Sequence, residues 1–152
     1  MMWRMHWKHL DPELQSAITG TLLCLTRASQ LYWTSIGEKF RVAASGRWTF
    51  ALKVCEFTEL PTLVAYQGGS AIVLVCDRQE SRAPSSTIMW GLLNLLDRQL
   101  PPHEVKSIAG EDGREQEERF EEDIAHRLDI TEGETTIEAL AGSILRELRG
   151  WR

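Results

Sequence analysis

The chain has 152 residues, of which 43% are hydrophobic and 26% are charged, and its formal net charge is −5. This length and composition predict one folded globular domain rather than a disordered or membrane-spanning chain. The net negative charge argues against nonspecific nucleic-acid binding, which requires a cationic surface that displaces counterions from the phosphates.

The first ten residues, MMWRMHWKHL, are rich in aromatic side chains. If this stretch is helical, Trp3, Trp7 and Leu10 lie on one stripe of the helix. Exposed tryptophans near a chain end must fold back onto the protein or contact another chain. We therefore predict that residues 1–10 form a docking segment, and we include Trp151, near the opposite end, among the predicted interaction residues.

A helix is predicted over residues 12–30. Asp11 can cap its first turn, and Pro12 has no N–H group that would be left unpaired there. Gly20 weakens the helical pattern and leaves a strand as the alternative for that stretch. The apolar stripe of the predicted helix consists of Leu14, Ile18, Leu22 and Leu25.

Beyond Lys39 the apolar residues alternate, which is typical of strands, and the sequence SGR separates two such runs. A two-residue turn here would pair Val42 with Thr49 and split the large side chains between the two faces. A three-residue turn would instead pair Val42 with Phe50 and Phe40 with Leu52. We predict the three-residue turn.

The sequences PTLVAYQ and SAIVLVCD, separated by Gly-Gly, predict a second hairpin with a type I′ turn. The expected pairs are Tyr66–Ala71, Ala65–Ile72, Val64–Val73, Leu63–Leu74 and Thr62–Val75. Both faces of this hairpin are apolar, so both should be covered. The fold class is thus α+β, with a four-stranded antiparallel meander sheet over about 38–77, one N-terminal helix and three C-terminal helices.

Three helices should follow the sheet. The predicted elements are a helix over 86–100, an exposed linker over 103–113, and helices over 113–129 and 136–150. The first is expected to bury Ile88, Met89, Leu92, Leu93 and Leu96 and to end at the Pro-Pro sequence. The second has only a narrow apolar stripe, formed by Phe120, Ile124 and Leu128, so it is expected to be peripheral.

Acidic residues are concentrated in the helical part over 111–152, which carries 13 acidic and six basic residues, a local charge of −7. Glu117 repels Glu121 and Glu118 repels Glu122, because each pair has i, i+4 spacing on the predicted helix. A helix that retains this repulsion is expected to present these four carboxylates to a basic partner, although such a run is also typical of a solvated helix face.

No catalytic or metal-binding motif emerges from the sequence. Ser70 follows two glycines that the hairpin turn explains, and Cys76-Asp77 ends an apolar strand. His6 and His9 supply two of the four ligands that a structural zinc site needs, so no metal or other cofactor is predicted. His103 and His126 are expected to be solvated.

Cys24, Cys55 and Cys76 are odd in number and widely spaced, which favours a reducing, cytoplasmic location over a disulfide framework. The apolar sequence AITGTLLCLT is too short to cross a bilayer, so no stable membrane insertion is expected.

These observations predict a non-catalytic protein-interaction module, adaptor or chaperone-like, over residues 11–152, acting as a homodimer or other homo-oligomer. The alternatives are a small-molecule-binding or hydrolytic domain with a pocket between sheet and helices, or an accessory subunit of a larger complex. A cleft that gathers His103 or His126 with Cys76 and Asp77 would favour the hydrolytic alternative.

Overall fold

The computed structural model describes residues 10–37, 39–53, 61–76, 84–99, 102–132 and 137–150. Its elements, in chain order, are α1 (Pro12–Arg27), β1 (Trp33–Ile36), β2 (Phe40–Ser45), β3 (Trp48–Lys53), β4 (Thr62–Gln67), β5 (Ser70–Cys76), α2 (Pro84–Gln99), α3 (Pro102–Glu132) and α4 (Ile137–Arg149). The predicted α+β class and the order of one helix, a sheet and three helices are confirmed. The sheet has one strand more than predicted.

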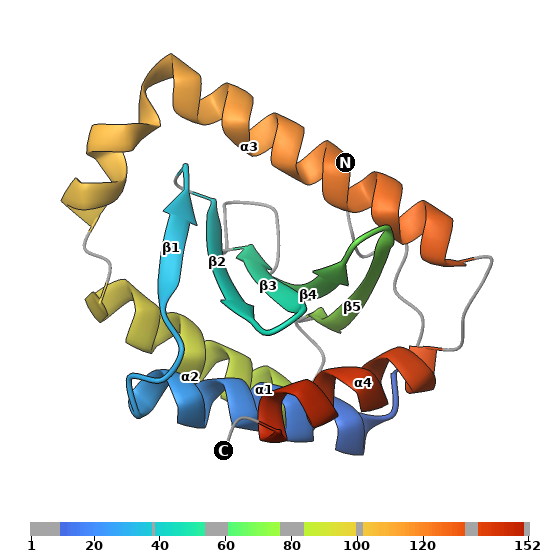
Figure 1. Cartoon of the computed structure of the whole chain (residues 1–152). Helices are drawn as coiled ribbons and strands as arrows, with labels where there is room; N and C mark the ends of the chain where they lie inside the picture. Colours follow the sequence, from blue (N-terminus) through green and yellow to red (C-terminus); the bar gives the residue numbers. More distant parts are fainter. Residues whose placement is uncertain are drawn as a thin grey trace.

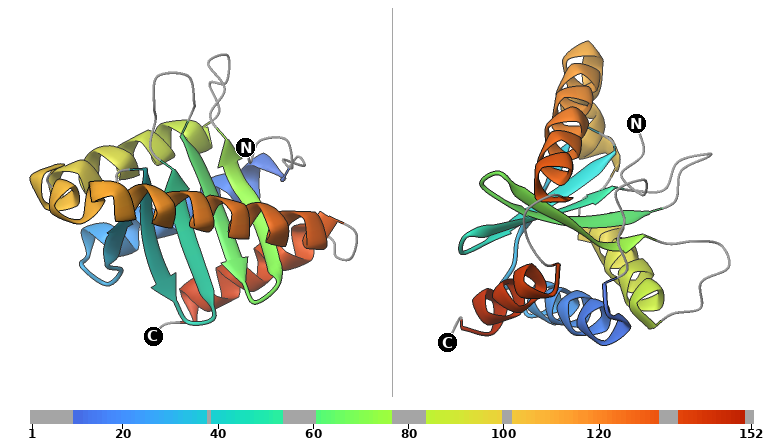
Figure 2. Two further views of the ribbon diagram at one scale, coloured as in Figure 1. Left: turned by 90° about the horizontal axis from the view of Figure 1, so that it is seen from above. Right: turned by 90° about the vertical axis from the view of Figure 1, so that its right-hand side faces the viewer.

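All five strands are antiparallel and lie side by side in sequence order. Helix α3 crosses one face of the sheet, whereas α1, α2 and α4 cover the other face (Figures 1 and 2). The apolar side chains accordingly form two clusters, one on each face. The expectation that both faces of the β4–β5 hairpin are covered is therefore confirmed.

The predicted start of α1 is confirmed in detail. The side chain of Asp11 accepts a hydrogen bond from the Glu13 N–H group at 3.3 Å, and Pro12 stands at the first helical position. The helix ends at Arg27, shortly before Ser29, whose φ of 57° does not continue a right-handed helix. Ile18 and Leu22 are fully buried, as the predicted stripe requires.

Strand β1 is the element that the sequence analysis missed. It has four residues, which are too few for an alternation of apolar and polar side chains to indicate a strand. It is tied to the end of α1, because the indole N–H of Trp33 donates a hydrogen bond to Thr26 Oγ1 at 3.0 Å. Tertiary contact therefore supports a strand that local pattern does not indicate.

The predicted three-residue turn between β2 and β3 is wrong, and so is the two-residue alternative that was considered. The turn consists of Gly46 and Arg47, which pairs Val42 with Ala51. Gly46 has a φ of 60°, which only glycine adopts without strain. The prediction assumed that the large side chains of both strands share one face.

In the structure those side chains lie on opposite faces. Phe40 and Val42 pack toward α3, whereas Trp48, Phe50 and Leu52 pack toward the other three helices. Because each face has its own helical cover, the register does not need to bring the large residues together.

The β4–β5 register is confirmed near its turn, where Tyr66 pairs with Ala71 and Val64 with Val73. A bulge then shifts the register by one residue, so Leu63 pairs with Val75 instead of Leu74. The predicted type I′ turn is also wrong. Gly68 has a φ of 55° but Gly69 does not have a positive φ, which is the pattern of a type II′ turn.

Two expectations for the C-terminal helices are wrong. Residues 103–113 are not a linker, because α3 runs through them from Pro102 to Glu132. Proline is well tolerated at the first position of a helix, and isolated glycines weaken a helix without ending it. Nor is α3 peripheral: Ile124 and Leu128 are buried against the sheet.

The inward residues predicted for α2 are mostly confirmed. Met89, Leu92, Leu93 and Leu96 are buried, and Ile88 is half-buried. Within the described ranges, no helix is both long enough and apolar enough to cross a membrane.

Candidate functional site

Four glutamates of α3 were predicted to face a partner. Two of them, Glu117 and Glu121, instead lie against the sheet of their own chain. Glu117 is 7% exposed, and its Oε2 accepts a hydrogen bond from the Lys39 N–H group at 2.9 Å. One turn later, Glu121 Oε1 lies 2.7 Å from Lys53 Nζ in a largely buried ion pair. These two carboxylates fix α3 to the strands beneath it. Glu118 and Glu122 are exposed and remain candidates for contact with a basic partner.

A carboxylate from α4 makes the same kind of contact on another turn of the sheet. Glu147 Oε1 accepts a hydrogen bond from the Arg47 N–H group at 2.9 Å. Both turns contain a glycine with positive φ, and a Cβ atom at Gly37 would overlap the Glu117 side chain, as one at Gly46 would overlap Glu147. These acidic residues therefore have structural roles at hairpin turns.

The aromatic interaction residues predicted for the chain ends, Trp3, Trp7 and Trp151, lie outside the described residues. Leu10, the last residue of the predicted docking segment, is fully buried in the cluster that α1, α2 and α4 share with the sheet. His6, His9, Cys55 and Asp77 also lie outside the described residues, as does the His103 side chain.

Of the side chains that the hydrolytic alternative requires, the structure describes only that of His126. His126 is exposed on α3, whereas Cys76 ends the edge strand β5. Ser70 begins β5 directly after the Gly-Gly turn, as the hairpin interpretation predicted. Among the described residues, no group of three or more His, Cys, Asp or Glu side chains is placed to hold a metal ion.

The ionisation of Tyr66 is displaced by its surroundings. Burial raises the pKa of its hydroxyl above the ordinary value of 10.0, although the nearby Arg127 guanidinium opposes that shift. Arg127 lies over the ring at 4.8 Å from the centroid, and Phe120 approaches edge-on. A tyrosine with a raised pKa is a poor general base near neutral pH, so this cluster is best explained as packing between α3 and the sheet.

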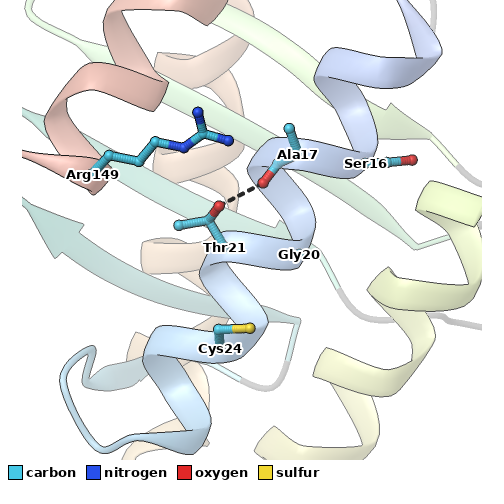
Figure 3. Close-up of a pocket in the computed structure, with 6 residues that line it drawn as sticks. All are labelled: Ser16, Ala17, Gly20, Thr21, Cys24 and Arg149. Carbon is cyan, nitrogen blue, oxygen red and sulfur yellow. Dashed lines mark hydrogen bonds between the residues drawn. The ribbon is translucent and has the colours of Figure 1, made fainter.

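An open, shallow groove lies on the outer surface of the three-helix layer and has a volume of about 690 Å³. Its lining residues are Ser16, Ala17, Gly20, Thr21 and Cys24 of α1 and Arg149 of α4 (Figure 3). The α1 residues face outward because the opposite side of the helix carries the buried Ile18 and Leu22. The floor of the groove therefore consists of small, uncharged side chains.

Arg149 is the charged residue of this lining and reaches from α4 toward α1 (Figure 3). Cys24 is exposed, and its thiol is free. The Thr21 hydroxyl donates a hydrogen bond to the Ala17 carbonyl at 2.6 Å, so it is occupied within its own helix.

Sequence reasoning did not identify this surface. The available signal was Gly20, whose position in a helix it treated only as a weakness, together with small residues at i, i+4 spacing on the side away from the apolar stripe. The position of these α1 residues relative to α4 and Arg149 could not be predicted from the sequence.

Comparison with known proteins adds no identity: no protein-family model, no curated protein and no solved structure matches this chain.

Proposed function

We propose that this protein is a non-catalytic protein-interaction module, adaptor or chaperone-like, that binds a protein helix along the groove of α1 and Arg149. The observation that carries the proposal is the groove itself: its floor is a line of small, uncharged side chains on an outward helix face. Small side chains allow the backbone of a second helix to approach closely.

The dimensions of the groove favour a helix over a small molecule. From Ser16 to Cys24 the floor runs for about 12 Å along α1, which is more than two helical turns. Small-molecule sites are concave and bury most of the ligand, whereas this groove is shallow and open. It also lies outside the helices, not between sheet and helices as the small-molecule alternative expects.

The hydrolytic alternative requires His103 or His126 beside Cys76 and Asp77, and of these side chains the structure describes only His126, which is exposed on α3. An accessory role in a larger complex would use the same groove with a different chain as partner. We also propose a reducing, cytoplasmic setting, in which the exposed thiol of Cys24 remains free.

Site-specific photo-crosslinking in the expressing cell tests this proposal. A photoreactive amino acid at Thr21, in the groove, should form a defined protein adduct. The same amino acid at Asn94, exposed on α2, serves as the matched control and should not form that adduct.

Gly20→Gln should abolish the adduct, because a longer side chain fills the groove at a position where a Cβ has room. Circular dichroism should show that this variant remains folded. Identical adducts from Thr21 and Asn94, or no adduct at Thr21, would contradict the proposal.

A further inference from the structure

The outward face of α1 carries a symmetrical pattern of charge and size. Glu13, Ser16, Gly20, Cys24 and Arg27 all point within about 40° of one direction, because successive helical residues are 100° apart. Glu13 and Arg27 each lie seven residues from Gly20, and Ser16 and Cys24 each lie four residues from it. The helix thus has an acid at one end, a base at the other and glycine midway.

The charges at the two ends have no partner in the described part of the chain. Glu13 and Arg27 are both exposed, and neither side chain forms an ion pair with another described residue. Between them the groove floor is uncharged. The surface is therefore complementary to a helix with the reverse order of charges.

We propose that this helix is α1 of a second copy of the chain, packed antiparallel about a twofold axis at Gly20. In that arrangement Glu13 of each copy faces Arg27 of the other, and Ser16 of each faces Cys24 of the other. A twofold interface uses the same surface on both subunits, and α1 satisfies this requirement because its charge pattern is reversed by the rotation. The inference rests on the proposed function and names the partner of that groove.

The contact is small, which determines how the dimer should behave. Sixteen residues of helix extend for about 24 Å, so one helix pair buries less than the standard interface of roughly 1,600 Å². We therefore expect a reversible dimer whose population depends on protein concentration. Arg149, at the side of the groove, adds a contact from α4.

Sedimentation equilibrium on the full chain tests the antiparallel register through charge reversal. The wild-type mass should rise from 17.3 kDa toward twice that value with concentration. Glu13→Arg and Arg27→Glu should each raise the dimer dissociation constant roughly tenfold, since each places like charges together at two symmetric positions. The double variant restores opposite charges and should recover wild-type association.

This double exchange separates an interface from an effect on α1 itself. Both single variants oppose the helix dipole, so their effects on helix stability would add in the double variant instead of cancelling. A protein that stays monomeric at every concentration, or a double variant weaker than either single variant, would overturn the inference.

A disulfide at the axis provides a second measurement. In a Cys24→Ser background, Gly20→Cys should form a covalent dimer on mild oxidation, because the two introduced thiols meet at the twofold axis. Cys24→Ser alone and Cys24→Ser with Asn94→Cys, exposed on α2, are the controls and should not form it. Equal dimer formation in all three would contradict an axis at Gly20.

The crosslinking test of the proposed function distinguishes the two failures. If the chain is monomeric but the Thr21 adduct contains a different protein, the groove is an interaction site and only the second copy is excluded. If no adduct and no dimer form, both proposals fail.

Discussion

The two faces of the sheet are covered by different means. On one face, three helices share a large apolar cluster with the strands, in which Trp48 and Leu22 are almost completely buried. On the other face, α3 is the one helix among the described elements that supplies the smaller cluster, and it adds polar attachments through Glu117 and Glu121. A helix whose narrow apolar stripe predicted a peripheral position can thus pack onto a face of the sheet when some of its carboxylates contact the strands and their turns.

The strongest test of this comparison is a charge beneath α3. Val73 is 4% exposed and lies in the smaller apolar cluster, so Val73→Asp would place a carboxylate among apolar side chains. This should cost several kcal/mol of a total stability of about 5 to 15 kcal/mol and unfold the protein. Thermal melting followed by circular dichroism measures it, with Val73→Ala as the uncharged control. An unchanged melting temperature for Val73→Asp would show that α3 does not seal this face.

A matched pair of truncations compares the two clusters directly. Leu22→Ala and Leu128→Ala remove the same atoms from opposite faces, where the side chains are 0% and 3% exposed. Leu-to-Ala changes in cores cost about 2 to 5 kcal/mol, depending on how far the surroundings collapse into the cavity. We expect Leu22→Ala near the upper end and Leu128→Ala near the lower end, because a single helix can shift onto the sheet. Urea unfolding measures both, and a larger loss for Leu128→Ala would reverse the comparison.

Substitutions at Gly37 and Gly46 compare the contacts that α3 and α4 make with the turns of the sheet. Gly37→Ala and Gly46→Ala each introduce a Cβ at positive φ, and that atom overlaps Glu117 of α3 or Glu147 of α4. Each should cost about 1 to 3 kcal/mol. Gly37→Ala should be the more severe, because Glu117 is the more deeply buried carboxylate.

Gly69→Ala is the control for these two variants, because it has no positive φ and no atom within 4 Å of the added Cβ. It should change the free energy of unfolding by less than about 0.5 kcal/mol. If all three variants lose equal stability, the carboxylate contacts contribute nothing specific.

The smallest expected effect concerns pH. Burial raises the pKa of Tyr66 above 10.0, so the folded state holds this proton at pH values where the unfolded chain has lost it. The resulting contribution to stability is complete below about pH 10 and declines as the pH rises further. Ultraviolet titration of a Tyr32→Phe variant, which leaves Tyr66 as the single tyrosine, should show ionisation above the ordinary range.

Arg127→Gln in that background removes the guanidinium that lowers the pKa of Tyr66 and should move the titration higher still. Arg119→Gln, exposed on the same helix, is the control and should leave it unchanged. A Tyr66 hydroxyl that ionises at or below its ordinary pKa would argue against α3 lying over this ring.

Much of the fold follows from local chemistry that can be read along the chain. Asp11 and Pro12 mark the start of α1, and Gly-Gly marks the tip of the β4–β5 hairpin. The apolar residues on both faces of that hairpin predicted a covering layer on each face, and the structure confirms both layers. These features are local or depend only on side-chain periodicity, so one sequence is sufficient to predict them.

Other features depend on contacts between distant residues. The β2–β3 register could not be chosen from side-chain size, because Phe40 and Phe50 belong to clusters on opposite faces. Similarly, Glu117 and Glu121 resemble a solvated charge run until α3 is placed over Lys39 and Lys53.

The proposed binding surface divides in the same way. The spacing of Glu13, Gly20 and Arg27 is set by the sequence alone, because a helix repeats every 3.6 residues. Only the tertiary structure decided that this face points outward beside Arg149, since burial of Ile18 and Leu22 against the sheet orients α1. A helix can display several faces in sequence, but the face left to a partner is the one that packing leaves uncovered.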